Sequence, residues 1–321
     1  MGNGHMQEGT KVQMKRYPIA VVIPTFNRVD VLMKCLGHLE RQSCTDFEVV
    51  VVDDGSTDST SDRMESYLRD TALAIRYLRQ ENHGPARARN HAISLVEAPI
   101  VLLIGDDIFA SPGLVAEHLK LHRGRPENSV AGLGLTRWSE VGQTVTAFMK
   151  WLDSDGLQFD YGSLLRGNKP NWGNFWTSNI SLKTSVLKEF QFDESFPHAA
   201  MEDIELACRI ESRHGLDMVF LPEALADHFH PTTFVQACSR MVKVGESTAY
   251  FDQLWPGKRR VTRNILKRPL QSILLTFPSA VPLWVKLADW SLKLVCPNSL
   301  MRYVLSCHFA IGYDKRKHGR P

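Results

Sequence analysis

The chain has 321 residues, of which 43% are hydrophobic and 23% are charged. This composition is typical of a soluble globular protein and excludes disordered, collagen-like and polytopic membrane chains. The length allows two domains, or one large α/β unit with an appendage. The net charge of +3 is unevenly distributed, because residues 256–321 hold 13 Lys and Arg against only Asp289 and Asp314. A basic tail after a mildly acidic body indicates a polyanionic partner for the tail, nucleic acid or membrane.

The six cysteines form no C-x-x-C pair, and most lie in apolar surroundings. This pattern indicates a reducing compartment rather than a disulfide framework or a zinc site. The first 18 residues lack the apolar core of a signal peptide. We therefore expect a cytoplasmic protein that begins with an N-terminal extension over residues 1–16.

The first half of the chain alternates short apolar runs with stretches of helical periodicity. The apolar runs predict strands at Ile19–Ile23, Phe47–Val52, Ile75–Arg79 and Ile100–Ile104. The periodic stretches predict helices over Val31–Arg41, Ser59–Leu68 and Ala86–Val96. This alternation predicts an α/β fold with a mostly parallel sheet and helices on both faces. Ligands of such sheets bind beyond the carboxyl ends of the strands.

The middle of the chain is less regular. A helix over Ile108–Leu121 and one over Glu202–His214 are expected, with strands over Ser129–Trp138 and Phe175–Leu182. Phe148–Asn174 is rich in aromatic residues and glycine, which favours a loop over the binding site.

The composition changes after Trp255, so we predict a main domain over residues 17–255 and a basic, helical segment over 256–321. Its longest uncharged stretch, Pro269–Val285, is 17 residues long and contains three prolines, too short and too broken for a spanning helix of about 20 residues. Short helices flanked by basic residues could instead lie in a membrane surface. Alternatively, they pack on the body or on a second copy of the chain in a homodimer. We expect no nucleic-acid partner.

Two acidic residues, Asp106 and Asp107, follow directly after the run Ile100–Ile104. Unpaired carboxylates are too costly to bury together in the core. We expect them at the rim of the sheet, where they could hold Mn²⁺ or Mg²⁺ with phosphate oxygens of a substrate. The alternative is a helix N-cap ahead of Ile108–Leu121, for which one Asp suffices.

A second polar cluster, Asp53–Asp58, follows the run Phe47–Val52. It is either an ordinary turn or a place where one Asp accepts a hydrogen bond from a nucleobase or ribose. His83–Asn90 opens a helix with two arginines, Arg87 and Arg89. Such a helix start favours an anion, unless the arginines form a solvated basic face.

Glu202 and Asp203 begin a helix, where acids also serve as partners of the helix dipole. His228 and His230 could be metal ligands, although a lone histidine is more often structural. Their alternation suggests one histidine on each face of a strand.

Together these segments resemble glycosyltransferase family 2, inverting enzymes with the GT-A (Rossmann-like) fold. The resemblance covers about Tyr17 to Pro231 and rests on the order and spacing of all the motifs. The motifs are Val22–Arg28, Val51–Asp58, Asn82–Asn90, Asp106-Asp107, Ser178–Leu182, Phe192–Glu194, Glu202-Asp203 and Arg209.

The resemblance implies a role for each matching position. Phe26 would pack on the nucleobase, within a nucleotide-binding set that also holds Pro24, Thr25 and Arg28. Asp54 would accept from a base N–H, with Asp53 beside it. Arg89, or else Arg87, would lie near the diphosphate, and Asp106 would meet the ribose.

The remaining positions bear on the reaction. Asp107 would be the main ligand of Mn²⁺ or Mg²⁺, and His228 would reach the metal or the diphosphate. The family's D-x-D element reads Gly105-Asp106-Asp107 here, so its first acid is missing. Asp203 would be the general base, with Glu202 as its neighbour.

The implied function is inverting transfer of a sugar from a nucleoside-diphosphate sugar to an acceptor hydroxyl. Pairing Phe26 with Asp54 suits uracil, so a UDP-sugar is favoured. The acceptor would be a glycan or a lipid-linked molecule, and the enzyme could attach peripherally to the inner face of the cytoplasmic membrane. A nucleotide-sugar-binding scaffold without activity is an alternative. So is a sugar-nucleotide pyrophosphorylase, although its Gly-rich loop is absent after Ile19–Ile23.

Overall fold

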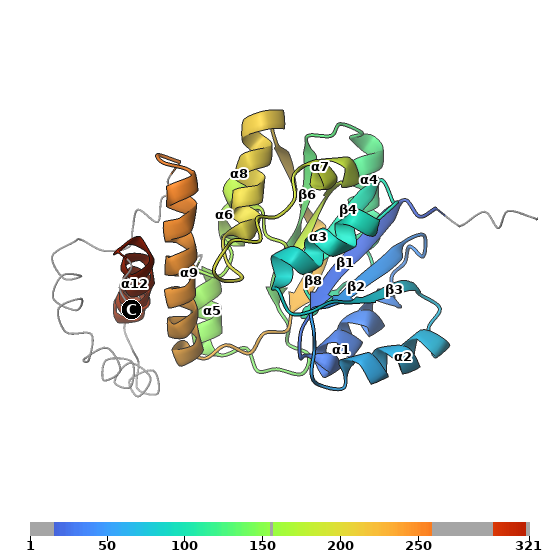
Figure 1. Ribbon diagram of the computed structural model, residues 1–321, viewed down its shortest axis with the longest axis horizontal. Helices are drawn as coiled ribbons and strands as arrows, with labels where there is room; N and C mark the ends of the chain where they lie inside the picture. Colours follow the sequence, from blue (N-terminus) through green and yellow to red (C-terminus); the bar gives the residue numbers. More distant parts are fainter. Residues whose placement is uncertain (1–15, 155–156, 259–297, 319–321) are drawn as a thin grey trace, which may run out of the picture.

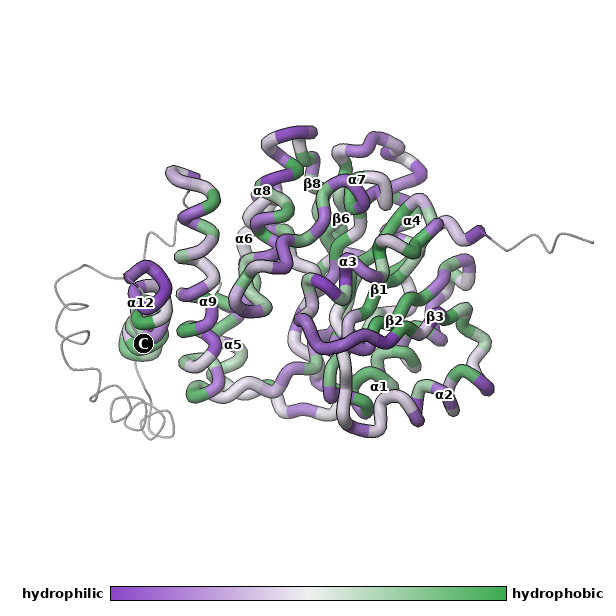
Figure 2. The backbone as a smooth tube through the Cα atoms, in the orientation of Figure 1, coloured by the Kyte–Doolittle hydropathy of each residue, from purple (hydrophilic) through white to green (hydrophobic). Residues whose placement is uncertain are grey.

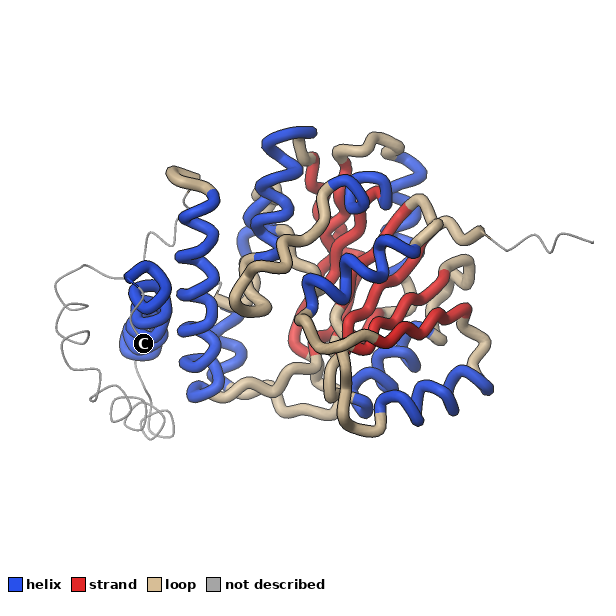
Figure 3. Tube along the Cα trace, in the orientation of Figure 1, coloured by secondary structure: helices blue, strands red, loops and turns tan. Residues whose placement is uncertain are grey.

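The computed structural model describes residues 16–154, 157–258 and 298–318. An eight-stranded sheet runs through the larger part of the molecule, with helices on either side of it (Figures 1 and 3). The strand order is β3-β2-β1-β4-β7-β6-β8-β5. The strands are β1 (Ile19–Thr25), β2 (Glu48–Asp53), β3 (Ala74–Arg79), β4 (Ile100–Ile104), β5 (Ile108–Ala110), β6 (Val130–Trp138), β7 (Asn179–Lys183) and β8 (Asp217–His228).

The first four strands are parallel to one another, as the sequence predicted. Between them run α1 (Val29–Leu39), α2 (Thr60–Asp70) and α3 (Pro85–Leu95). Because the chain crosses over after each strand, the carboxyl ends of β1, β2 and β4 meet at one edge of the sheet. That edge carries the predicted polar clusters.

Side chains of the strands alternate between two hydrophobic cores, which is why the apolar runs are continuous. Ile19, Val21 and Ile23 of β1 belong to the core formed with α1, α2 and α4 (Leu114–Gly124). Ala20 and Val22 belong to the other core, with α3, α7 (Thr184–Glu189) and α8 (Glu202–His214). Figure 2 shows the hydrophobic segments concentrated in the central strands.

The second half of the sheet is mixed. Strand β7 is antiparallel to both β4 and β6, and β6 is parallel to β8. The prediction of a helix over Ile108–Leu121 was wrong at its start, because Ile108–Ala110 forms β5, antiparallel to β8. Three residues are too few to show a strand period, and their partner lies far away in the sequence.

The prediction of a loop over Phe148–Asn174 was also wrong. This region contains α5 (Ala147–Ser154), α6 (Tyr161–Leu165) and a 3₁₀ turn, η1 (Trp172–Asn174). Its aromatic residues are largely buried, among them Phe148, Trp151 and Tyr161. The aromatic content that suggested a surface loop therefore belongs to a core.

Among the described residues, two helices of 21 residues each follow the sheet, α9 (Phe234–Leu254) and α12 (Asn298–His318). They lie side by side at the end of the molecule away from β3 (Figure 1). A third hydrophobic cluster joins α12 to α9 and α5, with Val304, Cys238 and Trp151 among its members. Within the described ranges, no helix combines the length and the apolarity that crossing a bilayer requires.

The division of the chain at Trp255 stays a prediction, as does the membrane-surface role of residues 264–312. Most of that stretch, residues 264–297, lies outside the described residues.

Candidate active site

Three strand ends bring predicted residues to the same edge of the sheet. Thr25 ends β1, Asp53 ends β2, and Asp106-Asp107 follow β4. Phe26, which directly follows β1, is a large hydrophobic residue that is 43% exposed. Pro24 lies within β1 and pairs with Val52 of β2.

Asp106 is almost fully buried and is held by two donors. The Thr25 hydroxyl donates to Oδ2 of Asp106 at 2.8 Å, and Nη1 of Arg28 donates to Oδ1 at 2.8 Å. Burial raises the pKa of Asp106 to about 7, against the opposing charge of Arg28. Asp106 therefore fixes both Thr25 and Arg28 at the end of β1.

Asp107 is the meeting point of four cationic or imidazole nitrogens. Its Oδ2 lies 3.1 Å from both Nη atoms of Arg28, 3.3 Å from Nε2 of His228 and 3.5 Å from Nδ1 of His230. Burial opposes ionisation, but His228, His230 and Arg28 together hold the pKa of Asp107 well below its usual range. Asp107 is thus kept as a carboxylate.

The side chains of Asp107, His228 and His230 offer one ligand atom each, all within 4.8 Å of one another. Both histidines contact the same carboxylate, so the expectation of one histidine on each face of a strand was wrong. Strand β8 ends at His228, and the strand alternation does not extend to His230. The β5–β8 pairing places Ile108 opposite His228, which brings the histidines to Asp107.

A stack of rings orients the two histidines. Trp138 lies parallel to His228 at a centroid distance of 5.4 Å, and His228 lies nearly parallel to His230 at 5.3 Å. The indole Nε1 of Trp138 donates to the Met149 carbonyl of α5 at 3.0 Å. The sequence does not predict this role of Trp138. Its only distinguishing feature there is its place at the end of an apolar strand.

Two buried acids at the end of β2 accept hydrogen bonds from other groups of the protein. Tyr77 donates to Oδ2 of Asp53 at 2.7 Å. The carboxylate of Asp54 accepts from the Gln80 amide at 2.7 Å and from the backbone N–H groups of His83 and Gly84 at 3.0 and 2.7 Å. Asp54 therefore closes the loop that leads into α3, and its contact with a nucleobase stays a prediction.

The two arginines of α3 lie in different surroundings. Arg87 is exposed, whereas Arg89 is buried, with Nη1 3.3 Å from Oε1 of Glu202. Burial raises the pKa of Glu202 to about 7, as does the charge of the adjacent Asp203. The diphosphate role of the arginines stays a prediction, since Arg89 already has Glu202 as a partner.

Among the described residues, some buried polar atoms, including three in residues of the predicted site, have no hydrogen-bond partner. These three are Nε of Arg89, Oε2 of Glu202 and Nδ1 of His228. Since buried polar groups are nearly always paired, these three atoms are available to contact a polar ligand.

The residue before the acid pair has a strained backbone. Met201 has φ 72°, in the left-handed region, and precedes Glu202 and Asp203 directly. A non-glycine residue in this region costs about 1–3 kcal/mol and persists only where its surroundings enforce it. Such strain is common at functional sites, and the sequence gives no signal of it.

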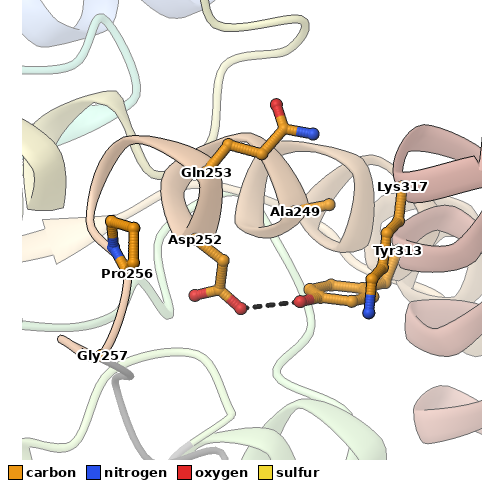
Figure 4. Close-up of a pocket in the computed structure, with 7 residues that line it drawn as sticks. All are labelled: Ala249, Asp252, Gln253, Pro256, Gly257, Tyr313 and Lys317. Atoms are coloured by element: carbon orange, nitrogen blue, oxygen red, sulfur yellow. Dashed lines mark hydrogen bonds between the residues drawn. The ribbon is translucent and has the colours of Figure 1, made fainter.

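A separate cavity of about 270 Å³ lies between the last turns of α9 and α12 (Figure 4). Asp252 and Tyr313 line it and are joined by a hydrogen bond of 2.7 Å. None of its lining residues belongs to the acid and histidine cluster.

Comparison with protein families gives one matching model, described as Glycosyl transferase family 2, over residues 20–196, more than half of the chain. The match includes the acids at the ends of β2 and β4.

Among curated proteins, validoxylamine A glucosyltransferase from Streptomyces hygroscopicus subsp. jinggangensis is 33% identical over 241 residues, 64% of this chain and 54% of that protein. The uncharacterized glycosyltransferase YfnE from Bacillus subtilis is 28% identical over 60% of this chain and 59% of its own length. The chain thus spans little more than half the length of these relatives.

Solved structures show the same fold at low identity. The mannosyltransferase PcManGT from Pyrobaculum calidifontis, in complex with GDP-Man and Mn²⁺, has a TM-score of 0.65 and 17% identity, over 96% of this chain and 89% of that chain. TarS residues 1–349 from S. aureus, in complex with UDP-GlcNAc, has a TM-score of 0.52 and 19% identity, over 94% and 91%.

Proposed function

Because this chain belongs to glycosyl transferase family 2, we propose that it is an inverting glycosyltransferase that uses a nucleoside-diphosphate sugar. One observation carries the proposal. Asp107, His228 and His230 converge at the strand ends, on the side of the sheet where such folds bind nucleotides.

The ligand set fits a divalent cation. One carboxylate oxygen and two imidazole nitrogens suit Mn²⁺ better than Mg²⁺, which prefers oxygen ligands and bound water. Asp107, His228 and His230 would hold the ion, which would supply positive charge where the leaving diphosphate gains negative charge. Arg28, which forms an ion pair with Asp107 in this structure, would instead bind the diphosphate.

The donor-binding side would be formed by the end of β1 and the end of β2. The exposed ring of Phe26 would stack on the base, and Thr25, Asp53 and Asp106 would line the sugar of the nucleotide. A UDP-sugar is our first choice. One structural neighbour is solved with UDP-GlcNAc and another with GDP-Man. The nucleobase that this chain prefers is therefore the quantity that the experiment below measures.

The reaction would be a single displacement. The carboxylate of Asp203 takes the proton of the acceptor hydroxyl, whose oxygen attacks the anomeric carbon as the bond to the diphosphate oxygen breaks. Glu202 and Arg89 would support Asp203 from the buried side. No covalent intermediate with the protein is needed, so the anomeric configuration inverts.

A glycan or a lipid-linked molecule would be the acceptor. Among relatives that match shorter segments, TarS is named a poly(ribitol-phosphate) β-N-acetylglucosaminyltransferase and is 37% identical over 90 residues. This similarity supports an acceptor in the biosynthesis of cell-envelope polymers. A peripheral position at the membrane would bring the site close to such an acceptor.

A thermal-shift panel of nucleoside diphosphates with and without Mn²⁺ tests the proposal. We expect the largest stabilisation from UDP with Mn²⁺, and loss of that stabilisation in Asp107→Ala. Mass spectrometry of the matching UDP-sugar incubated with the protein would then detect hydrolysis or transfer. Nucleotide binding without turnover of any nucleotide sugar would favour a binding scaffold instead.

A further inference from the structure

The loop that leads into the acid pair is held by helix α9. Nε2 of His198 donates to Oε2 of Glu246 at 2.8 Å, and both side chains are mostly buried. The hydroxyl of Tyr250 donates to Asp193 at 3.2 Å, and the Tyr250 ring meets Phe196 edge-on at 4.9 Å. Glu246 and Tyr250, one turn apart on α9, therefore hold the loop 193–201 at three of its residues.

The end of α9 also contacts the helix that carries the acids. Nε1 of Trp255 donates to Oε1 of Glu205 at 3.3 Å. Glu205 is buried, lies in the first turn of α8, and is paired with Arg209 at 2.8 Å. Glu205 follows Asp203 by two positions, so Trp255 contacts the same turn of α8.

Helix α12 contacts the same two side chains of α9. Nζ of Lys315 lies 3.9 Å from Glu246, and the guanidinium of Arg316 lies 5.5 Å from the centre of the Tyr250 ring. The two helices approach closely at Gly245 and Gly312. A side chain at Gly245 would overlap the backbone of Phe309, and one at Gly312 that of Val242. Helix α12 thus holds the side chains of Glu246 and Tyr250 in position.

The strain at Met201 explains why such support is needed. A left-handed methionine persists only where its surroundings enforce it. Met201 and Phe196 pack against the large core. Helix α9 holds Asp193 and His198 of the same loop.

We propose that the α9–α12 pair positions the catalytic acids, with Glu246 and Tyr250 as the positioning residues that act through the loop 193–201. This inference rests on the proposed function, because it takes Asp203 as the base. Displacing the loop would misplace Asp203 relative to the acceptor hydroxyl, while the donor site at the ends of β1, β2 and β4 would stay intact.

The test compares Glu246→Ala with Glu246→Gln, whose amide oxygen still accepts from His198. Lys243→Ala is the matched control, because Lys243 is an exposed residue of the same helix. We expect kcat of Glu246→Ala to fall about 10-fold to 100-fold, as misplacement of a reacting group does. UDP binding with Mn²⁺ should change by less than about twofold. Hydrogen exchange measured on the full chain should become faster at residues 194–203 in this variant alone.

If Glu246→Ala keeps the kcat and the hydrogen-exchange rates of the wild type, the proposal is wrong. It is also wrong if this variant loses kcat and nucleotide binding equally, because that result marks general destabilisation. Recovery of kcat in Glu246→Gln would support positioning by the hydrogen bond. If hydrogen exchange becomes faster in Glu246→Ala but Asp203→Asn keeps full activity, α9 does position the loop. In that case the assignment of Asp203 as the base is wrong.

Discussion

The two acids that begin α8 have different surroundings, although they are neighbours in the chain. Glu202 is 5% exposed and pairs with Arg89, and burial raises its pKa to about 7. Asp203 is partly exposed. An acceptor hydroxyl can therefore approach Asp203 more easily than Glu202, which favours Asp203 as the base.

We expect Asp203→Asn to lower kcat at least about 100-fold, since the amide keeps the shape and loses the basicity. Binding of the nucleotide with Mn²⁺ should stay close to that of the wild type. Steady-state kinetics and calorimetric titration measure the two effects, and Glu211→Gln on the same helix serves as control. Retention of more than about a tenth of the wild-type kcat would assign the base to another group.

Arg28 pairs with Asp107, the carboxylate proposed to bind the cation. Its Nη atoms lie 2.8 Å from Asp106 and 3.1 Å from Asp107, but the side chain is 35% exposed, so the pair is weakened by solvent. We expect Arg28→Gln to bind Mn²⁺ a few-fold more tightly without nucleotide and to bind UDP more weakly. Mn²⁺ titrations with and without UDP measure both. Weaker Mn²⁺ binding in the nucleotide-free variant would contradict this role.

At the scale of elements, α4 is joined to the sheet by a buried polar network. Nδ2 of Asn179 donates to the Ala224 carbonyl at 2.8 Å, so its Oδ1 accepts from Nε2 of His118 at 2.9 Å. Nδ1 of His118 then accepts the Ser181 hydroxyl at 2.7 Å, and Ser181 accepts from Nε2 of His122 at 2.9 Å. This arrangement requires His118 to be neutral, because Nδ1 of His118 accepts a hydrogen bond while Nε2 donates one.

Burial lowers the pKa of His118 to about 4 and, together with the charge of Lys183, that of His122 to about 3. In the unfolded chain both would titrate near pH 6.5. Their contribution to stability is therefore present above pH 6.5 and is lost as the pH falls toward 4, by about 2 kcal/mol per histidine at pH 5.

We expect the double variant His118→Gln/His122→Gln to lose less stability than the wild type between pH 7 and pH 5, because glutamine cannot take up a proton. Urea unfolding followed by circular dichroism at both pH values measures the difference. An equal loss in the two proteins would show that other groups dominate the acid sensitivity.

The sequence was sufficient for the parallel half of the sheet, and in the other half it predicted β6 and β7 but not β5. Strands such as Ile19–Thr25 and Ile100–Ile104 are continuous apolar runs, a signal that local sequence carries. Strand β5 has three residues and exists because β8 pairs with it. Long-range pairing of this kind leaves no local pattern, so the stretch was predicted as a helix.

The same distinction applies to the candidate site. Asp106, Asp107, Glu202 and Asp203 stand out because acids directly after an apolar run or at a helix start are visible in the sequence. The convergence of His230 on Asp107 depends on where β8 ends, and the support from Trp138 depends on a stack of rings. Neither follows from spacing along the chain.

At the scale of the whole molecule, the uneven distribution of charge suggests that the basic C-terminal part binds an anionic membrane surface. Lys315, Arg316 and Lys317 end α12, and further basic residues precede that helix in the sequence. We expect the intact protein to float with anionic liposomes at low salt, and to remain at the bottom with neutral liposomes or at high salt. Failure to float with anionic lipid would leave the α9–α12 pair as an internal support alone.

The place of β5 at the far edge of the sheet has a consequence for how the protein is made. The pairing of Ile108 with His228 closes a loop that spans more than a third of the chain, and closing long loops slows folding. During synthesis, β1 to β4 can assemble while residues 217–230 are still to be translated. We therefore expect the histidines to join Asp107 last, so that a nascent chain completes the proposed metal site only after the rest of the sheet has formed.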